Sequence, residues 1–204
     1  GGGLIPRPGE ISLADKGVLF LDEIAEFQKP VLEMLRQPLE EHFIKIIRNR
    51  GVYHFPAEFL LVAAMNPCPC GNYPNLNKCL CTSTQIQAYL SKISQPLLDR
   101  IDICVEAERV AYEDLQGARE ESSKDIRERV IMARERQKER YKGESITTNS
   151  QLNAEKIKQY CILGNEEEKM MRQAFDKLNL TARMYHKILC VARTIADLAG
   201  EEKI

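Results

Sequence analysis

The sequence predicts an α/β core followed by an all-helical domain, and two observations indicate this. First, the apolar runs at 18–21 and 59–64 have the length of strands buried on both faces, as in a parallel sheet. Second, strand patterns vanish after about residue 107, and charged amphipathic segments replace them. We therefore assign residues 1–106 to an α/β part and residues 107–204 to a helical part, with the boundary near residues 107–112.

The α/β part alternates strand and helix signals along the chain. Pro30 suits the first turn of a helix that continues to about Glu41. Alternating apolar and basic residues around Asn49-Arg50-Gly51 predict a β-hairpin. In chain order we expect a short helix or turn at 11–14, strand 17–21, helix 29–41, hairpin strands 43–48 and 52–55, strand 59–64, a cysteine loop at 68–81, helix 83–91 and a third strand at 101–105.

The helical part contains four expected helices. Ile126, Val130, Ala133 and Tyr141 recur on one face of the first. The expected ranges are 122–142, 153–160, 166–178 and 181–199.

Composition and charge exclude several classes of protein. The chain has 29 basic and 30 acidic residues, so any contact with nucleic acid requires a local basic patch. No apolar run approaches the roughly 18–20 residues that span a bilayer, and from the opening residues we expect no signal peptide. We expect a cytoplasmic protein. The opening Gly-Gly-Gly-Leu-Ile-Pro, without Met, predicts a fragment of a longer protein.

Two carboxylates follow the first buried strand. Asp22 and Glu23 come directly after Val18–Leu21, where desolvating a charge is costly. In nucleoside triphosphatases this arrangement is the Walker B element. There, Asp22 holds the Mg²⁺ of the nucleotide, and Glu23 orients or deprotonates the attacking water. The alternative is an ordinary strand followed by a capping Asp.

Three more polar residues occur where a nucleotide motor needs them. Asn66, at the tip of strand 59–64, can hydrogen-bond a γ-phosphate or the water, although it could simply cap a turn before Pro67. Arg100 suits a developing phosphoryl charge, although pairing with neighbouring Asp residues is the default for a surface Arg. Arg183 could contact phosphate from the last helix or be a solvated residue, and Arg193 competes with it for this role.

The combination resembles a known family. The segments 1–14, 17–23, 64–71, 97–103 and 191–198 are similar to the magnesium-chelatase-related AAA+ ATPases of the bacterial ComM/YifB type. The resemblance implies the C-terminal part of an AAA+ core followed by a helical lid. It implies that Asp22 and Glu23 are Walker B, Asn66 is sensor 1, Arg100 is the arginine finger and Arg183 is sensor 2. It further implies ATP and Mg²⁺ as ligands, assembly into a hexameric ring, and a role in DNA processing during natural transformation as a branch-migrating helicase.

The chain departs from that family in one respect. The phosphate-binding motif Gly-x-x-x-x-Gly-Lys-[Ser/Thr] does not occur in these 204 residues. In the family it lies upstream. We therefore expect the isolated chain to have no ATPase activity.

The paired cysteines predict a metal site. Cys68-x-Cys70 and Cys79-x-Cys81 lie on a turn-rich loop and can supply the four sulfur ligands that structural Zn²⁺ prefers. Free thiols, or disulfides formed on handling, are the alternatives.

The basic hairpin predicts a contact with DNA. Lys45, Arg48 and Arg50 would bind phosphates without reading sequence, as the corresponding hairpin does in related AAA+ motors. A solvated hairpin is the alternative. The AAA+ motor remains the leading interpretation. A non-enzymatic, zinc-stabilised DNA-binding or assembly module and a true magnesium-chelatase subunit acting on a porphyrin are the other two.

Overall fold

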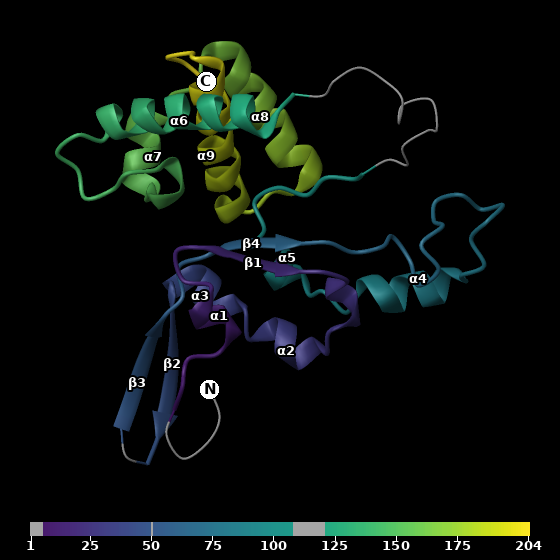
Figure 1. Ribbon diagram of the computed structural model, residues 1–204. Coiled ribbons are helices and arrows are strands. Elements are labelled where there is room, and N and C mark those ends of the chain that lie inside the picture. Colours follow the sequence, from purple (N-terminus) through teal and green to yellow (C-terminus); the bar gives the residue numbers. More distant parts are fainter. Residues whose placement is uncertain (1–5, 50, 108–120) are drawn as a thin grey trace. The chain divides into compact units, whose positions relative to one another are not determined.

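The chain divides into two compact units. The computed structural model describes residues 6–49, 51–107 and 121–204, and the division falls between Ile101 and Asp102, slightly before the expected boundary (Figure 1). Each unit has its own hydrophobic cluster.

The first unit is built around a parallel strand pair. β1 (Val18–Leu21) pairs in parallel with β4 (Leu60–Ala63), and Val18 lies opposite Leu60. Backbone bonds extend the pairing beyond both strands, since Lys16 N–H donates to Glu58 O and Ile24 N–H donates to Ala64 O at 3.0 Å. The carboxyl ends of the two strands therefore lie side by side.

Helices cover one face of this pair. They are α1 (Glu10–Leu13), the 3₁₀ turn η1 (Ile24–Glu26), α2 (Lys29–Glu33), α3 (Arg36–Glu41) and α5 (Gln95–Leu98). α4 (Ser83–Leu90) contributes no residue to the hydrophobic cluster of the described part of this unit. Leu19 and Leu21 pack against a core that contains Leu32, Leu35 and Leu97. On the opposite face Val18 and Phe20 are each 58% exposed, so the prediction of a strand buried on both faces was wrong. Within the described residues, helices of this unit cover one face alone.

The predicted helix at 29–41 is two helices. α2 ends at Glu33, and α3 starts at Arg36. Pro38 has no N–H to donate to the carbonyl of Met34 four residues earlier, and its ring clashes with that carbonyl. The interruption at Met34-Leu35 is the expected result.

β2 (Phe43–Arg48) and β3 (Gly51–Pro56) form an antiparallel pair that extends away from the parallel strands (Figure 1). Arg48 lies opposite Gly51, and Phe43 lies opposite Pro56. The aromatic rings of Phe43 and His54 are 5.1 Å apart and stabilise the base of the ribbon.

The expected third strand is absent from the described residues. Residues 101–105 form no regular element, and Ile103 and Val105 are 65% and 85% exposed. An apolar run becomes a strand only when another strand pairs with its backbone. The described part of the chain offers it no such partner.

The second unit is helical. It consists of α6 (Ser123–Arg140), the 3₁₀ turn η3 (Asn149–Gln151), α7 (Ala154–Tyr160), α8 (Asn165–Leu178) and α9 (Ala182–Ala199). α6 starts with a capping box in which Ser122 and Asp125 satisfy each other's backbone N–H groups. Its core contains Tyr141, Leu152, Ile157, Cys161 and Leu189. None of the helices in the described ranges is long and apolar enough to cross a membrane.

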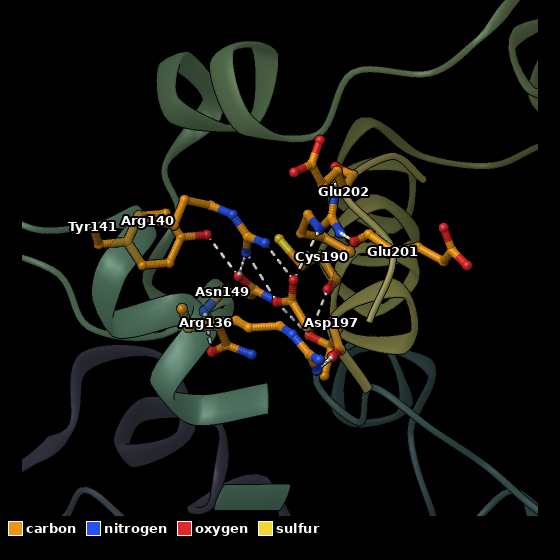
Figure 2. A network of polar contacts seen from close by, with 11 residues as sticks. Arg136, Arg140, Tyr141, Asn149, Cys190, Asp197, Glu201 and Glu202 are labelled. Carbon is orange, nitrogen blue, oxygen red and sulfur yellow. Dashed lines mark hydrogen bonds and ion pairs between the residues drawn. The ribbon is translucent and has the colours of Figure 1, made fainter. Parts of the chain in front are cut away.

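A buried ion-pair network fastens α6 to α9 (Figure 2). Asp197 is fully buried and accepts hydrogen bonds from both terminal nitrogens of Arg140, one of them at 2.9 Å. Asn149 donates to the same carboxylate at 2.9 Å, and the Tyr141 hydroxyl donates to Asn149 Oδ1 at 2.6 Å. The charges are paired and their hydrogen bonds are made, which is the condition under which burial of ions is tolerated.

The network makes the helical unit sensitive to acid. Burial tends to raise the pKa of Asp197, but hydrogen bonds from Arg140 and Asn149 outweigh it and hold the pKa below the ordinary 3.8. A depressed carboxyl pKa contributes stability that is fully present above the unfolded pKa and is lost as the pH falls through the folded pKa. We expect this contribution to be constant above about pH 5 and to decline below about pH 4.

Replacing the carboxylate tests this directly. Asp197→Asn leaves Arg140 without its buried counter-ion and should lower the free energy of unfolding of the helical unit by about 3 kcal/mol, measured by urea denaturation at pH 7. The variant should also lose the decline below pH 4. Glu201→Gln is the matched control, because it removes a nearby exposed carboxylate. Equal stability of Asp197→Asn and the unmodified chain would contradict the structural role.

Candidate nucleotide site and cysteine cluster

The two predicted Walker B carboxylates lie on the turn after β1 and are exposed to solvent. Asp22 and Glu23 are both exposed, and Asp22 Oδ1 accepts the N–H of Glu23 at 2.9 Å. Glu23 has φ 48° and ψ 45°, in the left-handed region that non-glycine residues seldom adopt. Such a backbone costs about 1 kcal/mol or more, and strained residues of this kind gather at functional sites.

Asn66 lies beside this turn. It is the third residue after β4, and the bond from Ile24 N–H to Ala64 O joins the two strand ends. The structure thus brings Asp22, Glu23 and Asn66 to one edge of the parallel pair. Their exposed carboxylate and amide oxygens have the chemistry that Mg²⁺ and its water shell prefer.

Tyr89 supports this edge, and sequence reasoning missed it. Tyr89 is 5% exposed at the end of α4, and its phenol lies against the backbone amide of Asn66. Burial raises the pKa of Tyr89, and the charges of Glu26 and Glu23 raise it further. Lys92 lies 5.4 Å from the centre of its ring and pairs with Glu26 at 3.5 Å. The helical spacing of Ile86 and Tyr89 was the available signal.

Arg100 belongs to the same unit but is held elsewhere. Its guanidinium donates to the carbonyl of Pro96 at 2.6 Å and pairs with Glu40 of α3. The side chain is only 13% exposed. In this conformation Arg100 is therefore engaged within its own chain, and its partner is Glu40 rather than Asp99 or Asp102.

The two candidates for sensor 2 differ sharply in environment. Arg193 is 2% exposed and donates at 2.6 Å to the carbonyls of both Glu201 and Glu202, beyond the end of α9. Its Nε also lies 3.3 Å from Asp197. Arg193 therefore has a structural role, whereas Arg183 is exposed in the first turn of α9. Arg183 belongs to the second unit.

The four loop cysteines converge. Their sulfur atoms all lie within 4.8 Å of one another, and this cluster could hold a metal ion. Cys68 Sγ lies 3.5 Å from Cys70 Sγ and 3.8 Å from Cys79 Sγ, and Cys70 Sγ lies 3.6 Å from Cys79 Sγ. These separations are far longer than a disulfide bond of about 2.05 Å. They match the edge of about 3.8 Å expected for a tetrahedron with Zn–S bonds of about 2.3 Å.

Backbone N–H groups surround the sulfurs. Tyr73 N–H lies 3.4 Å from Cys68 Sγ. Hydrogen bonds from the backbone of Asn72 and Leu80 lower the pKa of Cys70 to about 6, whereas burial raises the pKa of Cys81 to about 12. N–H groups directed at sulfur are the usual support of thiolate ligands around a metal.

Lys45 and Arg48 of the hairpin are exposed. Lys45 and Arg48 are three residues apart on β2, so their side chains lie on opposite faces of the ribbon. Both border a concave surface between the hairpin and the helices, together with Arg7, Met34 and Phe55. Arg50 lies outside the described residues.

Comparisons with known proteins cover the entire chain. Residues 1–115 match the family model of the magnesium chelatase subunit ChlI, and residues 120–204 match the model of its C-terminal part. The chain is 47% identical over its whole length to competence protein ComM of Haemophilus influenzae. It is 41% identical to YifB of Salmonella typhimurium and 42% identical, over 97% of its length, to YifB of Escherichia coli.

The chain spans about 40% of the length of these relatives. Identity at this level over the full chain, together with both family models, establishes the family. The chain belongs to the magnesium chelatase ChlI family and is of the ComM/YifB type.

Proposed function

We propose that this chain is the C-terminal part of the ATPase module of an AAA+ motor that remodels DNA, with residues 107–204 as its lid. The observation that carries the proposal is the juxtaposition of Asp22, Glu23 and Asn66 at the carboxyl edge of β1 and β4. In open α/β sheets ligands bind outside the carboxyl ends of the strands.

Each side chain has a distinct role in this proposal. Asp22 would hold Mg²⁺, which neutralises the charge of the nucleotide phosphates. Glu23 orients the attacking water and accepts its proton. Asn66 fixes the water or the terminal phosphate by a hydrogen bond. The left-handed backbone of Glu23 turns its side chain separately from that of Asp22, so the two carboxylates serve different partners.

Arg100 and Arg183 complete the proposed site across a ring of subunits. Arg100 would leave Glu40 and reach the nucleotide of a neighbouring subunit, where its planar cation stabilises the transferred phosphoryl group. Arg183 would contact phosphate from the lid. Because the chain has no phosphate-binding loop motif, we expect the 204-residue chain by itself not to hydrolyse ATP.

The role of Glu23 is tested in the full-length protein. Glu23→Gln keeps the size of the side chain and removes its basicity, so kcat for ATP hydrolysis should fall at least about 100-fold while nucleotide binding is retained. Steady-state phosphate release and a nucleotide-binding titration measure the two effects. Glu10→Gln, an exposed carboxylate of α1, is the control and should keep most of the activity. Full activity of Glu23→Gln would refute the proposed base.

Sharing of the site between subunits predicts complementation. Arg100→Ala should lower kcat about 1,000-fold, because an arginine finger contributes at least that factor. Mixing Arg100→Ala subunits with Glu23→Gln subunits should restore part of the activity, since some interfaces then join an intact Arg100 to an intact Glu23. If the mixture stays as inactive as its components, Arg100 does not act in a neighbouring subunit.

We further propose that the hairpin contacts the DNA backbone. The support is its exposed Lys45 and Arg48 and the name of a relative, competence protein. Reversing both charges with Lys45→Glu and Arg48→Glu should weaken DNA binding and reduce the slope of log K against log salt by about two, because about two phosphate contacts are lost. Lys138→Glu, on the exposed face of α6, is the control. Unchanged affinity and slope would exclude the hairpin.

The convergence of the cysteines supports a second candidate, a zinc-stabilised DNA-binding or assembly module without enzymatic activity. The sulfur separations fit a tetrahedral four-sulfur site of the kind that structural Zn²⁺ occupies, and four thiolates leave no open position for catalysis. The Glu23→Gln experiment separates the candidates, because the module has no hydrolysis to lose. A magnesium-chelatase subunit would share the ATPase chemistry and differ in acting on a porphyrin.

A further inference from the structure

The loop that follows Asn66 has almost no hydrophobic packing of its own. Residues 67–81 are all described, and Cys68 is the one among them that is buried. The large apolar side chains of the loop point outward, with Tyr73 at 41%, Leu76 at 79% and Leu80 at 90% exposure. Burial of apolar area, the usual source of stability, therefore cannot hold this loop in one conformation.

The sulfur cluster joins the two ends of the loop. Cys68 and Cys70 follow Asn66, and Cys81 directly precedes Thr82, the capping residue of α4. Thr82 Oγ1 accepts the N–H of Gln85 at 3.2 Å, so α4 begins at a fixed place beside the cluster. Near the C-terminal end of α4, Tyr89 lies against the backbone amide of Asn66.

The side chain of Asn66 lies close to this assembly. Gly71 has φ +72°, and a Cβ built on it would lie 3.7 Å from Asn66 Oδ1. Gly71 N–H also donates to Cys68 O at 3.0 Å. The Asn66 side chain thus lies near the turn between Cys68 and Asn72, and its backbone lies against Tyr89. If the cysteines separate, both contacts lose their support.

We propose that Zn²⁺ bound by Cys68, Cys70, Cys79 and Cys81 is a positioning element for Asn66. The metal replaces the missing hydrophobic core of the loop and fixes the turn on which Asn66 is placed. The proposal rests on the ATPase function above for its kinetic consequence, but its structural part stands independently of that function. Loss of the metal should free Asn66 while leaving Asp22 and the strand pair intact.

Metal content and hydrogen exchange of the full-length protein test the structural part. Protein purified anaerobically should contain one more equivalent of zinc than the variant Cys79→Ser with Cys81→Ser. Cys104→Ser replaces an exposed cysteine outside the cluster and should keep the zinc. Equal zinc in the protein and the double variant would overturn the proposal.

Removing zinc from the unmodified protein with a chelator avoids any folding defect of the variants. Amides in peptides covering 64–73 and 82–90 should then exchange at least about tenfold faster, while peptides covering 18–21 and 126–136 stay unchanged. Re-addition of Zn²⁺ should reverse the effect. Unchanged exchange at 64–73 after complete zinc removal would contradict the positioning role.

Kinetics then separate this inference from the proposed function. If both hold, zinc removal lowers kcat for ATP about as much as Asn66→Ala does, with nucleotide affinity retained, and the two changes together cost no more than either alone. If the exchange effect appears in a protein that never hydrolyses ATP, the ATPase function fails and the metal's positioning role stands. If zinc removal leaves kcat unchanged in an active enzyme, the positioning role fails.

Discussion

The parallel pairing of β1 with β4 is the constraint on which the first unit depends. Two segments about forty residues apart in the chain run in the same direction, so both must deliver their carboxyl ends to one edge. The register is continued past both strands by the bond between Ile24 and Ala64. A slip of one residue would move Leu19 and Leu21 from the helix-covered face to the exposed face, so burial of these residues holds the register and with it the acidic turn beside Asn66.

Asp197 of the helical unit and the carboxylates Asp22 and Glu23 of the first unit lie in opposite environments. This difference indicates that they have different roles. Asp197 is fully buried, and Arg140, Asn149 and Arg193 surround it. Such a group is committed to stability, because taking away any partner leaves a buried charge. Asp22 and Glu23 instead lie exposed on a strained turn and contribute little to packing. In the proposed function, the nucleotide and its Mg²⁺ are what this strained turn would serve.

Local sequence signals predicted most elements of this fold. The elements that were predicted wrongly depend on contacts between residues far apart in the chain. The apolar runs located β1 and β4, and the polar residues at 82 and 122 start helices where their side chains can cap them. Pro38 was a local signal for the break between α2 and α3 that helical spacing alone overlooked. The prediction of a third strand at 101–105 was wrong, because a strand needs a pairing partner and the periodicity of the sequence does not reveal one.

The site shows the same division. The cysteine spacing predicted the convergence of four sulfurs, since each pair is only two residues apart and a turn-rich loop closes the rest. In contrast, the pairing of Arg100 with Glu40 joins residues 60 apart, and the burial of Arg193 depends on the chain beyond the end of α9. Neither could be inferred from neighbouring residues. The roles of Tyr89 and Gly71 beside Asn66 are likewise consequences of the loop's path.

A cross-link by metal suits the surroundings of Asn66 for a physical reason. A side chain that contacts a small polar ligand must stay accessible, and in this structure Asn66 is exposed. Holding its turn by hydrophobic burial would require covering apolar area close to it, at about 25 cal/mol per Å². Four thiolates around one ion would fix the backbone while covering little apolar surface. The loop can therefore remain open to solvent, with Leu76 and Leu80 exposed, and still hold Asn66 in one place.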